Sequence, residues 1–355
     1  MRIVVYGLTV TSSWGNGHAT TYRSLLKALT RRGHQIVFVE KDVEWYRSNR
    51  DLPRPAFCTV ELYDDWAAEE TRLVRLSLDA DAVIVGSYFH DAIAASQALF
   101  AQVRCPVLFY DIDTPITLNR LRENGGTEYL DGRQIPAYSA YLSFTSGPAL
   151  QEIEQRFGAR RAVAFFCSVD PEIYHPTAIQ AEFQCALSYL GTYAGDRQGK
   201  LMELLNHAAG MLPAERFVVA GPQYPDTLSW NANVERIIHL PPPDHPAFYS
   251  SSRFTLNLTR SDMVAAGYSP SVRLFEASAC GAAILSDSWP GLTEFLTPGE
   301  EVLLPANGEE VARMVTGISE EERTRMGARA RERVLAAHTS EHRAIEFERI
   351  VSECA

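Results

Sequence analysis

The chain has 355 residues, of which 46% are hydrophobic and 22% charged, so it is long enough for two domains and has a globular composition rather than a disordered one. Its 33 basic and 44 acidic residues give a net charge of −11, which argues against a nucleic-acid surface and a polybasic membrane patch. The six cysteines are scattered without a CxxC pair or a metal-ligand spacing, which indicates free thiols in a reducing compartment. No apolar run is long enough to span a bilayer, and we expect a cytoplasmic protein.

The first half of the chain alternates predicted strands and helices. A strand over 3–6 leads into a loop over 8–17, and a helix with leucines at helical spacing then ends at Gly33 before a second strand over 35–40. Further strands are predicted over 81–86, 106–111, 140–144 and 162–166. This order predicts a parallel sheet with helices on both faces, in the style of nucleotide-binding domains.

The second half repeats this architecture. The segment 167–176 contains two prolines and no hydrophobic period, and we interpret it as a linker between domains. Strands are then predicted over 187–191, 216–221, 236–240, 253–257 and 283–286. Two helices close the chain, and their apolar positions are Met326, Ala330 and Val334 in one and Ala344, Phe347, Ile350 and Val351 in the other. We therefore expect an α/β fold with two Rossmann-like, doubly wound parallel-sheet domains, 1–168 and 169–338.

The stretch 268–287 is the main candidate for a binding site. Ser269 is predicted as an N-cap and Pro270 as the first helical residue, so the helix start would present free N–H groups and partial positive charge to an anion. Arg273 and Glu276 follow on one helix face, and the next strand ends where parallel sheets bind ligands. This combination suits a nucleotide diphosphate sugar. An ordinary exposed ion pair explains Arg273 and Glu276 equally well.

Other loops of the second half should reach the same sheet edge. Arg197 and Lys200 lie one turn apart at a helix start and can both neutralise phosphate oxygens, although a solvated helix face explains them too. The preference for one nucleotide base over another is expected to depend on backbone contacts near Leu240. Together with Arg197, Lys200, Arg273 and Glu276, the residues predicted to bind a donor are Gly191, Gln223, Leu240, Arg260, Tyr268, Ser271 and Glu294.

A glycine-containing loop precedes His18 at the first helix start. The loop lacks the third glycine of the dinucleotide fingerprint, because Thr20 stands there, although Glu40 ends the second strand as the fingerprint's acid would. It fits better as a flexible loop facing a cleft at the carboxyl edge of the sheet. His18 would orient a diphosphate or take a proton, while a capping or packed histidine explains it equally. The loop residues are Gly15, Asn16 and Gly17.

Three further polar residues follow strand ends in the first half. Asp111 and Asp113 form a DxD, but helix capping ahead of Pro115 explains the same letters, so we expect no metal and a role on the acceptor side of the cleft. His90 is in an equivalent position, where a helix N-terminal residue without chemistry is the alternative. If the reaction needs a protein base, the candidates are His18, His90, Asp111 and Asp113.

The sequence resembles glycosyltransferases of the GT-B fold, most closely the spore-maturation-protein-like group and more distantly the retaining family-4 type. The resemblance covers the second half well and the first half in outline. It is carried by Leu190–Thr192 with Arg197 and Lys200, Val169–Pro171, Ser271–Gly281 and Gly291–Glu301. The GT-B fold implies two Rossmann-like domains facing a cleft, an acceptor-side first domain, a donor-binding second domain and a last helix, 339–355, that crosses back to the first domain.

The resemblance also implies roles for individual residues. Glu276 matches the family glutamate that holds the ribose, and Arg197 and Lys200 match its diphosphate clamp. The family pattern has another glutamate eight residues earlier, where this chain has Tyr268. Arg273 is therefore expected to take over part of the electrostatic role in binding the donor.

The expected activity is transfer of a glycosyl group from a nucleotide diphosphate sugar to an unidentified acceptor, as in a hexosyltransferase, with retention and without a metal or other cofactor. In a retaining enzyme the donor phosphate receives the acceptor proton, whereas an inverting enzyme needs a protein base. Two alternatives stay open, a nucleotide-sugar epimerase on the same architecture and a non-catalytic two-domain binding protein. A NAD enzyme is disfavoured by Thr20.

Overall fold

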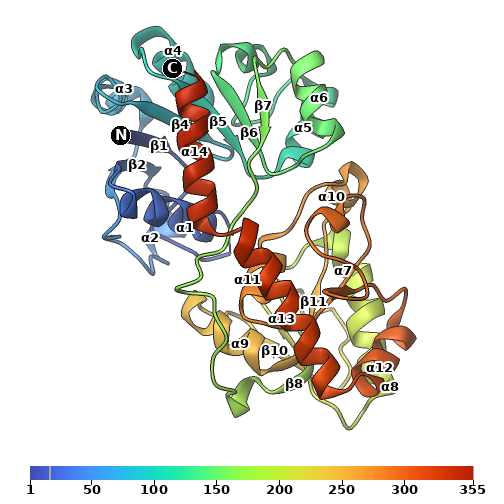
Figure 1. Ribbon diagram of the computed structural model, residues 1–355. Helices are drawn as coiled ribbons and strands as arrows, with labels where there is room; N and C mark the ends of the chain where they lie inside the picture. Colours follow the sequence, from blue (N-terminus) through green and yellow to red (C-terminus); the bar gives the residue numbers. More distant parts are fainter. Residues whose placement is uncertain (16, 355) are drawn as a thin grey trace. The chain divides into compact units, whose positions relative to one another are not determined.

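The computed structural model describes residues 1–15 and 17–354. Contacts between residues divide the chain into two compact units, Met1–Ser168 with Ser340–Ala355, and Val169–Thr339. Each unit is a parallel sheet with helices packed on it (Figure 1). Among the described residues, no helix is both long and apolar enough to cross a membrane.

The sheet of the first unit has seven strands. They are β1 Arg2–Tyr6, β2 Gln35–Lys41, β3 Thr59–Tyr63, β4 Ala82–Gly86, β5 Val107–Asp111, β6 Ala140–Ser143 and β7 Ala162–Ala164. All pair in parallel, in the order β3-β2-β1-β4-β5-β6-β7. Central strands such as β4 are buried throughout, because helices cover both faces of the sheet. The strand order reverses between β1 and β4, which is where sheets of this kind bind ligands.

The helices of the first unit include the last helix of the chain. They are α1 His18–Arg31, α2 Glu44–Arg47, α3 Trp66–Arg75, α4 Ala92–Gln102, α5 Thr114–Asn124, α6 Pro148–Gln155 and α14 Ser340–Cys354, with a 3-10 turn η1 at Gly132–Ala137. Helix α14 packs against α1, and Arg32 at the end of α1 binds both carboxylate oxygens of Glu348. The apolar positions predicted for α14, including Phe347, are buried.

The sheet of the second unit has six strands. They are β8 Cys185–Leu190, β9 Phe217–Ala220, β10 Val234–Ile237, β11 Ser252–Asn257, β12 Ile284–Ser286 and β13 Val302–Leu303. All pair in parallel, in the order β10-β9-β8-β11-β12-β13, so the order reverses between β8 and β11. The α/β class and the doubly wound parallel sheets predicted from the sequence are confirmed. Strands β3 and β13 were not predicted, and the ends of several other strands are shifted.

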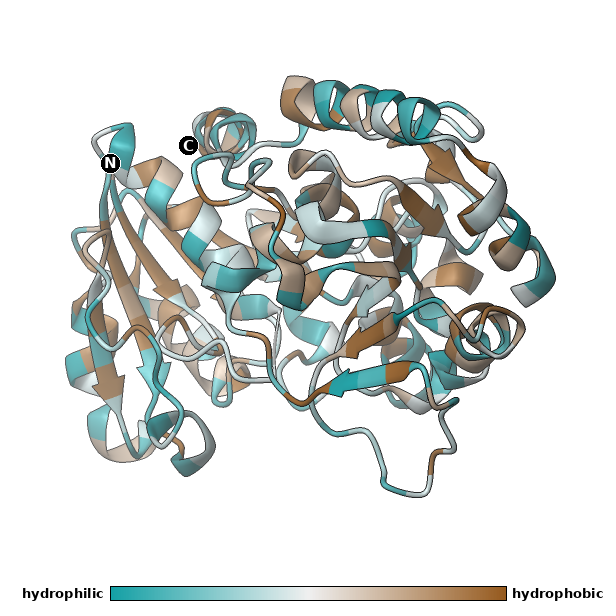
Figure 2. Cartoon of the chain, turned by 90° about the horizontal axis from the view of Figure 1, so that it is seen from below, coloured by the Kyte–Doolittle hydropathy of each residue, from teal (hydrophilic) through white to brown (hydrophobic). Residues whose placement is uncertain are grey.

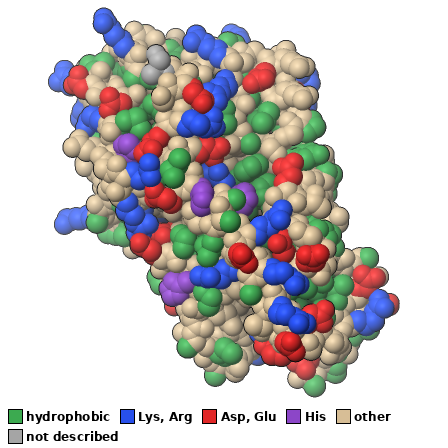
Figure 3. All heavy atoms as spheres, in the orientation of Figure 1, with side chains coloured by type: hydrophobic (Ala, Val, Ile, Leu, Met, Phe, Trp, Pro, Cys, Tyr) green, Lys and Arg blue, Asp and Glu red, His purple; other side chains and the backbone are tan. Residues whose placement is uncertain are grey.

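The helices of the second unit vary in length. They are α7 Gly195–Leu201, α8 His207–Met211, α9 His245–Ser251, α10 Ser261–Ala266, α11 Val272–Ala279, α12 Gly308–Gly317 and α13 Glu320–Ala337. A π-helical segment, η3 Met202–Asn206, joins α7 to α8, and 3-10 turns lie at η2 Ala181–Phe183, η4 Pro242–Asp244 and η5 Leu292–Glu294. Hydrophobic residues gather in the strands, while the longer helices alternate polar and apolar faces (Figure 2). On the face shown in Figure 3, basic and acidic side chains are interspersed.

The start of α11 differs from the prediction. Ser269 and Pro270 precede the helix, which begins at Val272 after an extended Ser271. Tyr268 adopts a left-handed φ of 54°, and its N–H donates to the Pro290 carbonyl at 2.6 Å, which holds this segment outside the helix. The predicted N-cap at Ser269 is therefore wrong, because a non-local backbone bond fixes the residue before it.

Packing of α14 on the first unit gives a test of stability. Phe347 is fully buried and its ring lies 6.4 Å from that of Phe165, whereas Ile345 on the same helix is 48% exposed. Phe347→Ala should lower the free energy of unfolding by about 3–5 kcal/mol, because it leaves a cavity. Ile345→Ala should change it by less than about 1 kcal/mol. Urea denaturation measures both, and equal losses would contradict this packing.

Candidate functional site

The Arg273 side chain lies at the carboxyl ends of β8 and β11 and hydrogen-bonds to both. Its Nε donates to the Leu190 carbonyl at the end of β8, and its Nη1 donates to Asn257 Oδ1 at 3.1 Å and to the Leu258 carbonyl at 3.4 Å. The Ser271 hydroxyl donates to the same Asn257 oxygen at 2.7 Å. The guanidinium is therefore held by neutral oxygens on both sides of the point where the strand order reverses.

Gly191 lies directly against this guanidinium. A Cβ at Gly191 would lie 2.7 Å from Arg273 Nη2 and 2.8 Å from the Tyr189 hydroxyl, so no larger residue fits without movement. The Tyr189 ring centroid lies 4.7 Å from the Arg273 guanidinium carbon and 6.0 Å from that of Arg197. Glycine thus keeps the backbone close to two cations and one aromatic ring.

Arg197, the second of these cations, is half-buried in α7. One of its terminal nitrogens donates to the Thr192 carbonyl, while its Nε is buried without a hydrogen-bond partner among the described residues. The buried Tyr189 hydroxyl also lacks a partner there. Burial lowers the pKa of Arg197, and the Arg273 charge lowers it further. Within 1–15 and 17–354, neither arginine has a carboxylate in ion-pair range, so positive charge is left uncompensated beside Gly191.

Lys200 in α7 and Arg260, just before α10, both have counter-ions. Lys200 Nζ lies 3.1 Å from Asp287 Oδ2, and this carboxylate also accepts from the Thr259 hydroxyl at 3.0 Å. Arg260 Nε lies 3.6 Å from a carboxylate oxygen of Asp196. The two cations predicted as a clamp therefore differ: Lys200 is neutralised by Asp287, whereas Arg197 is not.

Glu276 lies one turn beyond Arg273 in α11 and is 4% exposed. The Tyr249 hydroxyl donates to its Oε2 at 3.5 Å, and the Tyr174 hydroxyl also hydrogen-bonds the carboxyl group. Burial raises the pKa of Glu276 to about 7, against the opposing effect of Tyr174, Arg273 and Tyr249. The alternative of an exposed Arg273–Glu276 surface pair is wrong, because both side chains are buried.

The remaining residues predicted to bind a donor are less closely connected. Gln223 is exposed with a left-handed φ of 69°, and Glu294 is exposed in η5. Tyr268 is half-buried and pairs with Pro290 as described above. The Leu240 carbonyl accepts from His245 Nε2 at 3.2 Å. Direct contacts thus join Gly191, Arg197, Ser271 and Arg273 through their shared neighbours Tyr189 and Asn257.

The loop after β1 in the first unit is tied down. Buried Glu40 accepts from the N–H groups of Val10 at 2.7 Å and Thr11 at 3.1 Å, and also from the Thr11 hydroxyl. Arg23 binds the Val10 carbonyl and both oxygens of Asp51. The predicted flexible loop is therefore a fixed one over its described part, and Glu40 is not placed to hold a ribose as the dinucleotide fingerprint requires. Gly15 and Gly17 flank Asn16, which lies outside the described residues.

His18, at the start of α1, faces Asp113 at the start of α5. Its Nε2 lies 3.7 Å from Asp113 Oδ2, and its ring packs edge-on against Tyr88 at 5.2 Å. His18 Nδ1 is buried and has no hydrogen-bond partner among the described residues. Tyr88 follows β4 with a left-handed φ of 63°. These three residues bring together the ends of β1, β4 and β5, the carboxyl edge of the first sheet.

Asp111 and His90 do not join this pair. Asp111 is fully buried and accepts from Tyr141 and from the Thr117 hydroxyl at 2.9 Å, and burial raises its pKa to about 6. The oxygens of Asp111 therefore bind interior side chains and do not face solvent. His90 is exposed, and partial desolvation followed by the Lys41 charge lowers its pKa. Among the described residues, no group of three His, Cys, Asp or Glu side chains could hold a metal.

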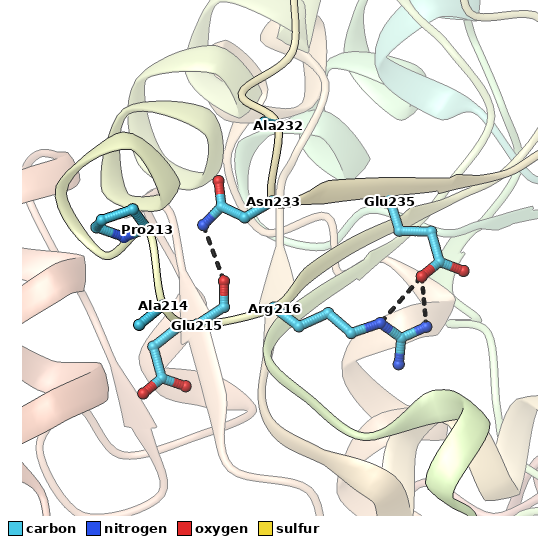
Figure 4. A pocket seen from close by; sticks show the side chains of 7 residues that line it. All are labelled: Pro213, Ala214, Glu215, Arg216, Ala232, Asn233 and Glu235. Carbon is cyan, nitrogen blue, oxygen red and sulfur yellow. Dashed lines mark hydrogen bonds and ion pairs between the residues drawn. The ribbon is translucent and has the colours of Figure 1, made fainter.

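A hollow of about 440 Å³ lies at the other edge of the second sheet (Figure 4). Arg216 and Asn233 stand just before β9 and β10, so this hollow is at the amino ends of the strands. The Asn233 amide donates to the Glu215 carbonyl at 2.8 Å, and Arg216 binds Glu235. Because these polar groups satisfy one another, we do not assign the hollow as the site.

The sequence analysis missed the aromatic surroundings of the charged residues. Tyr189 lies inside β8, where the sequence pattern alone indicates a core residue and no role in a site. Tyr174 comes from the linker and Tyr249 from α9, and they meet Glu276 only in the folded unit, where His245 contacts Tyr174. The one local signal is that His245 and Tyr249 lie four residues apart, a spacing that puts them on one face of α9.

Residues 197–349 match the family described as Glycosyl transferase-like. This match covers less than half of the chain. A comparison with curated proteins finds no match. Among solved structures, the sucrose-phosphate synthase of Thermosynechococcus elongatus is 12% identical, with a TM-score of 0.71 over 99% of this chain and 98% of that one. Anabaena HepE in complex with UDP and glucose is 12% identical, with a TM-score of 0.73 over 99% and 100%. AviGT4, a glycosyltransferase of avilamycin A biosynthesis, is 14% identical, with a TM-score of 0.63 over 100% and 98%.

The raised pKa of Asp111 predicts a pH-dependent stability. A folded-state pKa of about 6 lies above the unfolded value, so the native state binds this proton more tightly, and the stabilisation is lost as pH rises through 6. Between pH 4 and 7 the wild type should therefore lose roughly 1–3 kcal/mol of unfolding free energy relative to Asp111→Asn. Urea denaturation across this range measures the difference. Exposed Asp79→Asn is the control and should follow the wild type; a parallel course for Asp111→Asn would contradict the assignment.

Proposed function

We propose that this chain, which has the GT-B fold of glycosyltransferases and a glycosyltransferase-like domain, transfers a glycosyl group from a nucleotide diphosphate sugar to an acceptor. The second unit would bind the donor and the first unit the acceptor. The observation that carries the proposal is the pair of guanidiniums of Arg197 and Arg273, without counter-ions among the described residues, beside Gly191. Cations that are buried or half-buried in this way are stabilised by an arriving anion.

A diphosphate suits these cations better than a carboxylate does. Arg197 offers its unpartnered Nε, and Arg273 offers the Nη2 that faces Gly191, so two directed donors converge from different elements. A diphosphate has enough oxygens to accept from both, and charge-assisted bonds of this type are the strong ones. The unpartnered Tyr189 hydroxyl adds a third donor. The complex of Anabaena HepE with UDP and glucose supports the same class of ligand.

Charge stabilisation in the transition state follows from this arrangement. Breaking the bond from the sugar to the diphosphate places negative charge on the leaving oxygen, and prearranged guanidiniums stabilise that charge. Arg273 is fixed by the Leu190 and Leu258 carbonyls, so it needs no reorganisation during the reaction. With such a leaving-group site, the reaction we propose needs no metal. That it is retaining is proposed from the family resemblance alone. In an inverting reaction His18, paired with Asp113, would be the base.

Arg197→Gln tests the diphosphate assignment. It should weaken UDP binding by about 10- to 100-fold, since a charge-assisted hydrogen bond contributes roughly 1.5–3 kcal/mol, and it should leave uridine binding nearly unchanged. Isothermal titration calorimetry measures both, with GDP and guanosine as the second pair. Arg216→Gln, at the other edge of the sheet, is the matched control. Unchanged affinity for every diphosphate tested would refute the donor site.

Gly191→Ala tests the close approach of the backbone. Its Cβ would press on Arg273 Nη2 and Tyr189, so we expect the affinity for a nucleoside diphosphate to fall at least tenfold. Gly199→Ala is the control, because a Cβ there meets nothing within 4 Å and alanine favours the helix by up to about 1 kcal/mol. Calorimetry and thermal denaturation of both variants separate binding from stability. Full affinity in Gly191→Ala would place the diphosphate elsewhere.

Turnover separates transfer from the epimerase alternative. Incubation with a panel of nucleotide diphosphate sugars and no acceptor should give at most slow hydrolysis, because the sugar needs an acceptor. Conversion of one nucleotide sugar into another, detected by anion-exchange chromatography, would replace the transferase by an epimerase.

A further inference from the structure

Lys200 and Asp287 form an ion pair whose two members are held very differently. The Asp287 side chain is 4% exposed, and its Oδ1 accepts from the Thr259 hydroxyl at 3.0 Å and from the Thr259 N–H at 3.1 Å. The Lys200 side chain is 47% exposed, and its Nζ lies 3.1 Å from Asp287 Oδ2. Among the described residues, the donors to this carboxylate come from Thr259 and Lys200. Asp287 is therefore fixed in place, whereas Lys200 is a long side chain that is free to turn.

The pair lies next to the two arginines of the proposed diphosphate site. Lys200 is one turn beyond Arg197 in α7, a spacing that puts both side chains on one face of the helix. Arg273 Nη1 donates to the Leu258 carbonyl, and the Asp287 carboxylate binds the residue that follows Leu258. Strand β12, which ends just before Asp287, is the neighbour of β11 on the side away from β8. Asp287 therefore lies on the β12 side of the diphosphate site.

The sugar of a nucleotide diphosphate sugar would lie on this side. The strand order is β10-β9-β8-β11-β12-β13, and the diphosphate site is at the ends of β8 and β11. The base is expected near Leu240, which follows β10, so the nucleoside end extends toward β9 and β10. The glycosyl group is bonded to the other end of the diphosphate and then extends toward β12 and Asp287. A carboxylate is a strong acceptor for the hydroxyl groups of a sugar.

We propose that Lys200 exchanges its partner when a nucleotide sugar binds: Nζ moves from Asp287 to the diphosphate, and a sugar hydroxyl donates to Asp287 in its place. The inference rests on the proposed function, and it adds Asp287 as a residue that distinguishes a nucleotide sugar from a free nucleoside diphosphate. A free diphosphate leaves Lys200 where it is, because its departure would strand a buried carboxylate without a counter-ion. Once the sugar has been transferred, Lys200 returns to Asp287, and the weaker hold on the nucleoside diphosphate favours its release.

Lys200→Met tests the exchange, because it removes the ammonium and keeps most of the length of the side chain. Affinity for a nucleotide sugar should fall about three- to tenfold, and affinity for the matching nucleoside diphosphate should change less than about twofold, since Lys200 reaches the phosphates only when a sugar takes its place. Isothermal titration calorimetry measures both, with UDP-glucose, UDP-galactose and GDP-mannose against UDP and GDP. The control is Arg325→Met, in an exposed ion pair on α13, which should change neither affinity.

Asp287→Asn should act with the opposite sign on a nucleoside diphosphate. The amide keeps an oxygen for Thr259 but removes the charge that retains Lys200, so affinity for the diphosphate should rise about three- to tenfold. Affinity for a nucleotide sugar should not rise with it, because a neutral amide is a weaker acceptor for the sugar hydroxyl. Combined with Lys200→Met, Asp287→Asn should raise the affinity for the diphosphate by less than about twofold. A rise of equal size with and without Lys200 would show that the lost charge acts through space, and would overturn the exchange.

The outcomes separate this inference from the proposed function. If no nucleoside diphosphate and no nucleotide sugar binds, the donor site fails and the exchange fails with it. If both classes bind and Lys200→Met weakens both equally, or neither, the ion pair only links α7 to β12; the inference is then overturned while the donor site stands. Binding of nucleoside diphosphates without any nucleotide sugar would also overturn it. Thermal denaturation shows which variants fold, and if Asp287→Asn does not, the comparison in Lys200→Met still decides.

Discussion

The binding of Arg273 to backbone carbonyls is the interaction on which the second unit's carboxyl edge depends. One side chain joins the ends of two neighbouring strands, at Leu190 and Leu258, and orders the loops that follow both. Because these partners are neutral, the guanidinium keeps its full charge toward Gly191. A carboxylate partner would hold the side chain as well but would cancel the field that attracts a phosphate. Lys200, one turn beyond Arg197 in α7, has such a partner in Asp287.

The two units use the same sheet order but prepare their edges differently. In the first unit, Arg23 and the buried carboxylate of Glu40 hydrogen-bond to the backbone of the loop after β1, which fixes the conformation of this loop. In the second unit, the equivalent position after β8 is Gly191, with polar groups beside it that lack partners within the described chain. An edge with unsatisfied donors is suited to bind charge.

Much of the fold could be predicted from the sequence, because parallel strands buried on both faces give apolar runs that stand out. The two unpredicted strands, β3 and β13, are edge strands, and these lack that signal: β3 is partly exposed and β13 has two residues. Gly191, Arg197 and Arg273 could be nominated from strand ends and from the family resemblance. The sequence does not show that Arg197 lacks a counter-ion while Lys200 has one, because the partner of Lys200, Asp287, is 87 positions away. The burial of Asp111 and Glu276 likewise depends on distant tyrosines, Tyr141 and Tyr249.

Helix α14 belongs to the unit formed by the start of the chain, so the second unit is an insertion between Ser168 and Ser340. During synthesis the inserted unit has all its strands and helices before the first unit receives its last helix. Until then, the face of α1 that α14 covers stays bare to chaperones or to other nascent chains. The second unit is therefore complete in sequence while the first unit still lacks the helix that covers α1.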